Sequence, residues 1–361
     1  MTQNASVEVL LQEGHNRLDR GQYEAALETF QQATELEPQN PQVLYGLGLA
    51  CYRLERYQES VECLNQALQI KSDNILALVR RGLAYQQLEL NEQATADFEQ
   101  AIQMEPQDYE DWRGQGIALD EMKRYEEAIT SYDKAIEIKP DQYLAWNNRG
   151  VSLFYLGRYE EAIASFDKVI EFNPDNHQAW YGRAIALHNL RQFEEALASF
   201  DKVIDIQPDN DSAWYYRGTA LGNLGRYEEA LTSFGKVIEI KPDNDSAWYY
   251  RGSALNSLER YEEALASFDK VIDIQPDNDS AWYYRGTALG NLGRYEEAIA
   301  SFDKAIDIQP DNDAAWYNRA MALEDLGRLE EALTSFDKAI TIQPDLHEAW
   351  YPSSVTLREL E

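Results

Sequence analysis

Residues 211–244 read DSAWYYRGTALGNLGRYEEALTSFGKVIEIKPDN, and a closely similar segment returns every 34 positions along the chain. The tryptophans mark this period, because all eight are spaced by 34 residues: Trp112, Trp146, Trp180, Trp214, Trp248, Trp282, Trp316 and Trp350. A fixed period of this length is typical of a solenoid, in which each repeat packs mainly on its neighbours. The sequence therefore predicts one repeat array and not a set of globular domains.

Within one unit, the apolar and small residues fall on the faces of two helices. Trp214, Gly218 and Leu221 are spaced by four and three residues, which places them on one helix face. Gly225 can adopt the left-handed conformation that ends a helix, and a second apolar helix face follows it. Pro242 stops this second helix, and the Asp and Asn residues behind it suit the start of the next helix. Each unit is therefore predicted to be a helix pair with two short turns.

This unit resembles the tetratricopeptide repeat (TPR), and the whole chain resembles a long TPR array of the bacterial type. The family pattern is met by Trp214, Gly218, Ala230, Phe234 and Pro242. Departures cluster at the front, where leucine replaces the tryptophan in the first three units. The resemblance implies an all-α fold, in which antiparallel helix pairs stack as a right-handed superhelix. It also implies a concave groove that is lined by the first helix of each pair.

The units divide the chain into three parts. Residues 1–6 form an N-terminal extension, residues 7–346 form ten tandem units, and residues 347–361 are expected to form a C-terminal capping helix. No spacer separates the units, so the array leaves no place for a catalytic domain. The sequence also lacks a phosphate-binding loop, a nucleophile motif and metal-ligand spacing. We therefore expect no enzyme, no catalytic residue, no cofactor and no metal site.

The composition limits the classes of partner and the compartment that are expected. The chain has 64 acidic and 32 basic residues, a net charge of −32, which disfavours binding to nucleic acid or anionic lipid. This acidity either keeps a long solenoid soluble or forms a docking surface for a basic partner. No apolar stretch approaches the ~18 residues of a membrane helix. Because only Cys51 and Cys63 are present and no signal peptide is seen, we expect a cytoplasmic protein that does not insert into membranes.

The best candidates for partner contact follow the tryptophan position in successive units. They are Arg113, Asn147, Tyr181, Tyr215, Tyr249, Tyr283 and Tyr317. The resemblance places this position in the groove, where tyrosine offers a large rigid ring and a hydroxyl group. Asn223 and Asn291, near the end of their first helices, could hydrogen-bond a peptide backbone. Tyrosine is also common at this position in TPR units whatever they bind, so a structural interpretation stays open.

Two patterns of basic residues bear on the partners and on the packing of the helices. All eleven lysines lie in second helices or in turns, so the groove lacks the lysines with which some TPR domains hold C-terminal tails of heat-shock chaperones. We do not expect such tails as partners. Arginine also recurs once per unit on the first helices: Arg149, Arg183, Arg217, Arg251, Arg285 and Arg319. Each needs a carboxylate or a route to water, and we expect these arginines to be structural.

The sequence predicts a non-enzymatic scaffold or adaptor that binds peptide segments or partner proteins in its concave groove. The alternative is an assembly or structural factor that docks folded subunits on its edges and outer acidic surface.

The repeat itself generates a test of the solenoid. Deletion of one whole unit, Asp245 to Asn278, should leave a folded helical protein, because the new neighbours have nearly the same sequence as the old ones. Deletion of residues 245–261, half a unit, should cause a much larger loss of helical signal and melting temperature, because it pairs the wrong faces. Equal losses in circular dichroism melts of the two proteins would contradict a solenoid.

Overall fold

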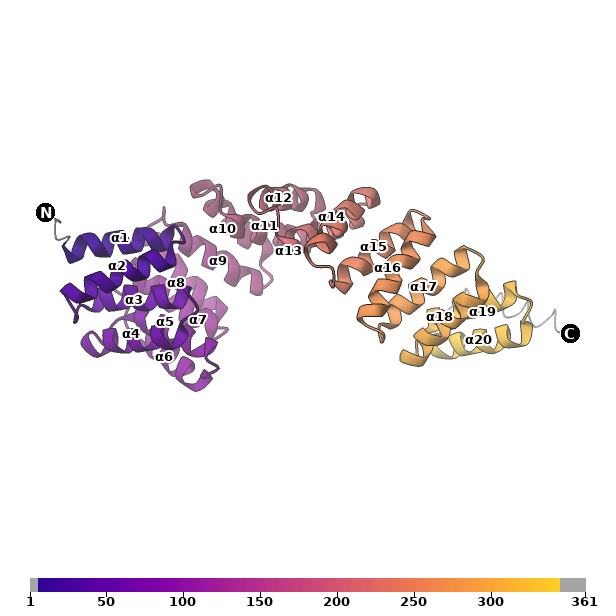
Figure 1. Ribbon diagram of the computed structural model, residues 1–361, viewed down its shortest axis with the longest axis horizontal. Helices are drawn as coiled ribbons and strands as arrows, with labels where there is room; N and C mark the ends of the chain where they lie inside the picture. The colour runs from indigo at the N-terminus through magenta and orange to yellow at the C-terminus, as the bar shows by residue number, and fades with distance from the viewer. Residues whose placement is uncertain (1–5, 345–361) are drawn as a thin grey trace. The chain divides into compact units, whose positions relative to one another are not determined.

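The computed structural model describes residues 6–344, which consist of helices joined by short turns and contain no β-strand (Figure 1). Each unit forms one helix pair. The first helices are α1 (Val7–Asp19), α3 (Pro41–Arg53), α5 (Ile75–Gln87), α7 (Tyr109–Glu121), α9 (Tyr143–Tyr155), α11 (His177–Asn189), α13 (Asp211–Asn223), α15 (Asp245–Ser257), α17 (Asp279–Asn291) and α19 (Asp313–Asp325). The second helices are α2 (Tyr23–Leu36), α4 (Tyr57–Ile70), α6 (Asn91–Gln103), α8 (Tyr125–Ile138), α10 (Tyr159–Phe172), α12 (Phe193–Ile206), α14 (Tyr227–Ile240), α16 (Tyr261–Ile274), α18 (Tyr295–Ile308) and α20 (Leu329–Ile342).

The predicted all-α solenoid of helix pairs is confirmed. The expected capping helix at residues 347–361 lies outside the described residues. No helix in the described range is long and apolar enough to cross a membrane.

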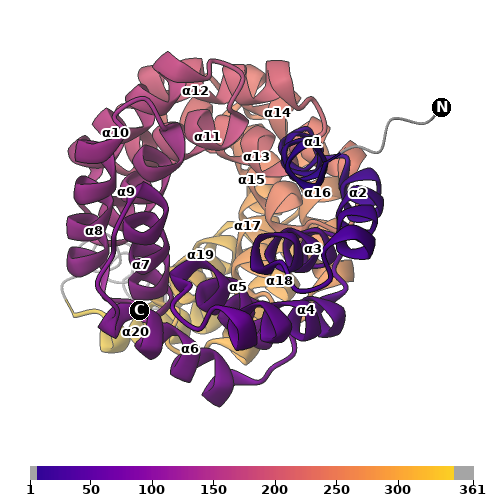
Figure 2. The same cartoon turned by 90° about the vertical axis from the view of Figure 1, so that its left-hand side faces the viewer.

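The chain forms two compact units, one up to Ala186 and one from Leu187 onward. In each, a first helix packs on its own second helix, which packs on the first helix of the following pair. First helices also contact the first helices of neighbouring pairs. For example, α5 contacts α7, and α15 contacts α17. The first helices therefore form one layer, the first-helix face, and the second helices form the other, the second-helix face. Figure 2 shows this layering for α7 to α10.

A contact between an aromatic ring and a glycine sets the distance between the helices of a pair. Phe234 of α14 lies against Gly218 of α13, where an added Cβ would come within 2.7 Å of the ring. The same contact recurs between Gly252 and Phe268. Both phenylalanines are almost fully buried. At Gly218 and Gly252 the absence of a side chain lets the backbone approach this closely, as the sequence predicts for small residues at this position.

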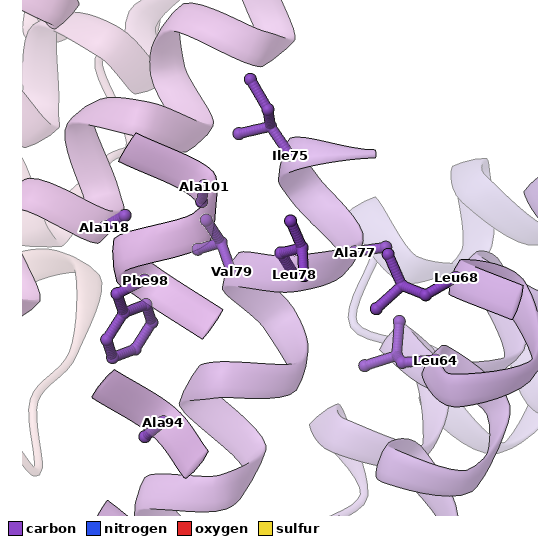
Figure 3. Packing of buried hydrophobic residues seen from close by; sticks show 10 residues of the cluster. All are labelled: Leu64, Leu68, Ile75, Ala77, Leu78, Val79, Ala94, Phe98, Ala101 and Ala118. Carbon is purple, nitrogen blue, oxygen red and sulfur yellow. The ribbon is translucent and has the colours of Figure 1, made fainter. Parts of the chain in front are cut away.

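The core is shared between successive pairs. Figure 3 shows one cluster, in which Leu64 of α4, Leu78 of α5 and Phe98 of α6 pack together with Ala118 of α7. Leu64, Leu78, Phe98 and Ala118 are each exposed by no more than 2 % of their surface. Because the cluster takes residues from more than one pair, a single pair cannot bury it, and stacking completes the core.

Turns and caps have the predicted chemistry. Gly225 has a φ of +72°, in the left-handed region, and ends α13 as expected. The Asp-Asn-Asp segments act as helix starts, because the central asparagine accepts a hydrogen bond from the third residue of the following helix. Asn210 caps α13 in this way through the backbone N–H of Ala213, and Asn244 caps α15.

The arginines of the first helices reach toward the second-helix face. Arg217 donates from Nε to Asp201 Oδ1 at 2.7 Å and from Nη1 to Ser233 Oγ at 2.8 Å, and its guanidinium lies 5.7 Å from the Trp214 ring centroid. The aspartate stands sixteen residues before the arginine. Five such pairs form an arginine ladder: Arg149–Asp133, Arg183–Asp167, Arg217–Asp201, Arg285–Asp269 and Arg319–Asp303. The expected structural carboxylates are therefore present at these five positions.

Arg251 differs from the other arginines because the residue sixteen positions earlier is Gly235. Arg251 keeps the hydrogen bond to serine, from Nη1 to Ser267 Oγ at 2.6 Å, and its guanidinium lies 5.7 Å from the Trp248 ring centroid. Among residues 6–344, no carboxylate forms an ion pair with it. Burial lowers the pKa of Arg251 from the ordinary arginine value. Arg251 is half-buried and keeps a route to water, the other alternative expected for this position.

A substitution at position 235 can supply the aspartate that the equivalent positions carry. Gly235→Asp should stabilise the protein by about 1 kcal/mol, because it supplies the carboxylate for Arg251 and removes a glycine from the middle of α14. Gly235→Asn gives a similar helix propensity without the charge and should recover only a few tenths of a kcal/mol. Urea unfolding measures both. Equal stabilities for the Asp and Asn variants would show that the ladder contributes nothing at this position.

Candidate functional site

Four of the tyrosines predicted for the groove lie in the compact unit that begins at Leu187. Tyr215, Tyr249, Tyr283 and Tyr317 come from α13, α15, α17 and α19, and all four are half-buried. Each ring contacts the phenylalanine of its own pair. The centroid distances are 6.3 Å for Tyr215–Phe234, 6.1 Å for Tyr249–Phe268, 6.1 Å for Tyr283–Phe302 and 5.9 Å for Tyr317–Phe336. These tyrosines are therefore part of the core as well as of the surface.

A second tyrosine, one residue further along, joins successive pairs. Tyr250 stacks on Phe234 of the preceding pair, with a centroid distance of 5.9 Å, and meets Tyr215 edge-on at 5.8 Å. Tyr284 repeats both contacts with Phe268 and Tyr249. We call the set the tyrosine ladder, which comprises Tyr215, Tyr216, Tyr249, Tyr250, Tyr283 and Tyr284. Because its rings bridge neighbouring pairs, the ladder stabilises their stacking.

The hydroxyl groups of Tyr215 and Tyr249 are neutral donors and acceptors. The ring of Tyr215 lies beside that of Tyr250 and the ring of Tyr249 beside that of Tyr284, while Asn318 Nδ2 donates to Tyr283 Oη at 3.0 Å. Burial, with the neighbouring tyrosine as a smaller cause, raises the pKa of Tyr215 and of Tyr249 well above the usual tyrosine value. Both groups therefore keep their protons at physiological pH.

A hollow of about 570 Å³ opens beside the tyrosine ladder at the start of α15 and α17. Its lining is aromatic, polar and acidic: Tyr215, Asp245, Ser246, Tyr249, Tyr250, Gln275, Asp277, Asn278, Asp279 and Ser280. Tyr250 is 40 % exposed, so its ring is open to a ligand. This lining contains three carboxylates and no lysine or arginine, and it can accept hydrogen bonds from donors and cations.

A larger hollow of about 850 Å³, with no aromatic residue in its lining, lies at the turns before α3 and α5. It is lined by turn and capping residues: Glu37, Pro38, Gln39, Asn40, Pro41, Gln42, Lys71 and Asn74. Asn40 and Asn74 are the caps of α3 and α5, so structural roles account for these polar groups.

Comparison with known families agrees with this geometry. A tetratricopeptide repeat profile matches residues 11–75, 147–211, 215–279, 260–313 and 283–347, which together exceed half of the chain. Two further profiles of the same repeat match residues 116–155 and 75–108. The chain belongs to the tetratricopeptide repeat family. TPR proteins are generally interaction modules that bind proteins or peptides.

Solved TPR structures share the fold. A TPR protein from Cytophaga hutchinsonii is 18% identical, with a TM-score of 0.58 over 66% of this chain and 97% of that one. A TPR protein from Parabacteroides merdae is 19% identical, with a TM-score of 0.50 over 69% and 98%. YrrB, described as a TPR protein with an unusual peptide-binding site, is 28% identical over 51% of this chain and 95% of its own, with a TM-score of 0.48. No curated protein matches the chain significantly.

The remaining groove candidates of this TPR array have different surroundings. Arg113, Asn147 and Tyr181 belong to the compact unit that ends at Ala186, and not to the unit that holds the tyrosine ladder. Arg113 is only 8 % exposed, and its Nη2 donates to Glu110 at 2.5 Å. Tyr181 is half-buried. Asn147 is half-buried too, and its buried Oδ1 has no hydrogen-bond donor within residues 6–344.

The two candidate asparagines of the second compact unit are exposed. Asn223 donates from Nδ2 to the carbonyl of Thr219 at 2.8 Å, and Asn291 donates to that of Thr287 at 2.9 Å. One of the two N–H donors of each side chain is therefore engaged with its own helix.

A half-buried carboxyl group in the first compact unit, that of Asp120, links three helices. Asp120 of α7 accepts hydrogen bonds from Tyr132 Oη and Ser152 Oγ, both at 2.6 Å, and so links α7, α8 and α9. Burial raises the pKa of Asp120 to about 6, and the two hydrogen bonds oppose this rise. The signal in the sequence is Tyr132, which stands where most units of this TPR array have phenylalanine.

This carboxyl group predicts a pH dependence of stability. An unfolded aspartate has a pKa of about 3.9, so the folded protein holds the proton of Asp120 more tightly. The stabilisation is complete below about pH 4 and is lost as the pH rises to about 6. Asp120→Asn should remove this part of the pH dependence, whereas Asp141→Asn, at an exposed turn, should not. Urea unfolding between pH 4 and 7 measures it, and an unchanged profile in Asp120→Asn would contradict the assignment.

Proposed function

We propose that this TPR protein is a non-enzymatic scaffold that binds an extended segment of a partner protein along the first-helix face of α13 to α19. The observation that carries the proposal is the tyrosine ladder with the hollow beside it. The rings give flat contact area that loses little rotamer entropy on binding. Because similar groups recur in each unit, one extended segment can make several weak contacts that act together.

The charge of the hollow favours a segment that carries lysine or arginine. Asp245, Asp277 and Asp279 line it, with no basic residue among the lining groups. Opposite charges steer association and help to fix its specificity. The exposed ring of Tyr250 adds a surface on which a guanidinium or ammonium group can rest. An acidic or anionic ligand has no such complement here.

The compartment that we propose is the cytoplasm. Cys51 and Cys63 are both free thiols, and Cys51 is buried against the apolar cluster around Phe30. Such thiols persist where the surroundings are reducing.

Docking of folded subunits on the second-helix face is the second candidate function. The observation that favours it is Arg251, which has no ion pair within residues 6–344.

Selection of peptides tests the groove. A displayed library of random peptides is selected on the full chain, and the affinity of the best binders is measured by calorimetry. The combined variant Tyr215→Ala, Tyr249→Ala and Tyr283→Ala should weaken binding by roughly two orders of magnitude, since each ring contributes on the order of 1 kcal/mol. The selected peptides should also be enriched in lysine and arginine.

A matched control separates binding from stability. Tyr227, Tyr261 and Tyr295 are also half-buried, in the same three units, but stand at the start of second helices. Their combined change to alanine should lower the melting temperature and leave the affinity unchanged. Because the tyrosine ladder also supports stacking, all affinities are measured at a temperature where circular dichroism shows every variant to be folded. Equal affinity of the first triple variant and the parent would rule out the groove.

A further inference from the structure

In the units from α9 to α19, six arginines occupy one repeated position, and five of them hold an aspartate of the preceding second helix. We propose that the sixth, Arg251, forms with the open space beside Gly235 a carboxylate-binding site on the second-helix face, filled by an Asp or Glu side chain of a partner protein. This site does not depend on the first-helix groove, because it lies on the other layer of helices.

The geometry of Arg251 is that of its paired equivalents. Ser267 and Trp248 hold its guanidinium at 2.6 and 5.7 Å, as Ser301 and Trp282 hold that of Arg285 at 2.6 and 5.8 Å. In the equivalent arginine, Nε donates to Asp269 at 2.7 Å. The Nε of Arg251 therefore faces the side of α14 that carries Gly235.

The space beside Gly235 is open. A Cβ built on this glycine meets no atom within 4 Å, so a carboxylate brought by another chain has room to approach. Lys236, the neighbour of Gly235, is exposed and already paired with Glu239 at 2.7 Å. Lys236 therefore does not compete with Arg251 for an incoming carboxylate. The guanidinium of Arg251 is the cation that this carboxylate meets.

The energetics favour a carboxylate here. A half-buried guanidinium has lost part of its hydration, and the lowered pKa of Arg251 reports the same desolvation. A charge-assisted hydrogen bond from Nε replaces this lost hydration. The acidic surface does not prevent it, since the array itself places a carboxylate at five equivalent positions. Repulsion from more distant acidic groups is screened beyond about 8 Å at physiological salt.

The site also gives the array a unique position. The units that begin at Asp211 and Asp279 are nearly identical, so a partner that contacts several units could shift by two units with little cost. An acidic side chain that pairs with Arg251 fixes the alignment, because every other position of this kind is already neutralised by the chain's own aspartate. Specificity then comes from one departure within a repeated surface.

The test uses acetate as the probe, because it has the functional group of an aspartate side chain. The Nε–H resonance of Arg251 is followed by NMR in the full chain and assigned with Arg251→Lys. Addition of sodium acetate should shift this resonance with saturation, while sodium chloride at the same ionic strength should not. Gly235→Asp should weaken the response at least about tenfold, because the new carboxylate occupies the site.

A second variant supplies the matched control. Asp201→Gly removes the carboxylate of Arg217, which lies between Ser233 and Trp214 as Arg251 lies between Ser267 and Trp248. The acetate response should then appear at Arg217. An Arg251 resonance that ignores acetate, or that responds equally in Gly235→Asp, would overturn the site. If all arginine resonances responded alike, the effect of acetate would be non-specific ionic screening, and this result would overturn the site too.

Discussion

The contact of Phe234 with Gly218 determines how closely the two helices of a pair can lie, and the surfaces of the array follow from it. At 2.7 Å from a built Cβ, the ring occupies the volume that any other side chain would need. One face of this ring packs inside its own pair, and Tyr250 of the next pair stacks on it at 5.9 Å. The ring therefore positions the neighbouring pair as well as its own partner helix, and with it the tyrosines that line the hollow.

Much of this fold could be predicted from residue spacing. Gly225, Phe234 and the capping asparagines have the roles that their positions in the repeat suggest, because helix ends and close approaches are local constraints. The site was less predictable. The sequence places Tyr215 and Arg113 at equivalent positions, yet Arg113 is enclosed and paired with Glu110, whereas Tyr215 lines a hollow. Such differences depend on neighbours from adjacent pairs, which the spacing within one unit does not specify.

The departures from the repeat carry the most specific chemistry. Tyr132 in place of phenylalanine brings a hydroxyl group to Asp120, and Gly235 in place of aspartate leaves Arg251 without an ion pair. Both replacements are visible in the sequence. Their meaning is not, because it requires knowing that Asp120 is half-buried beside Tyr132 and Ser152, and that Arg217 and its equivalents pair with the residue sixteen positions before them. In a family whose units share one architecture, such positions distinguish one array from another.

The central claim is that a partner segment lies on the first-helix face beside the tyrosine ladder, and site-specific photo-crosslinking tests it most directly. A photoreactive phenylalanine derivative is placed at Tyr250, which lines the hollow, and separately at Lys236, which is exposed on α14. Irradiation with a bound, selected peptide should give crosslinks at position 250 and not at position 236. Crosslinks at position 236 alone would contradict the account and place the partner on the second-helix face.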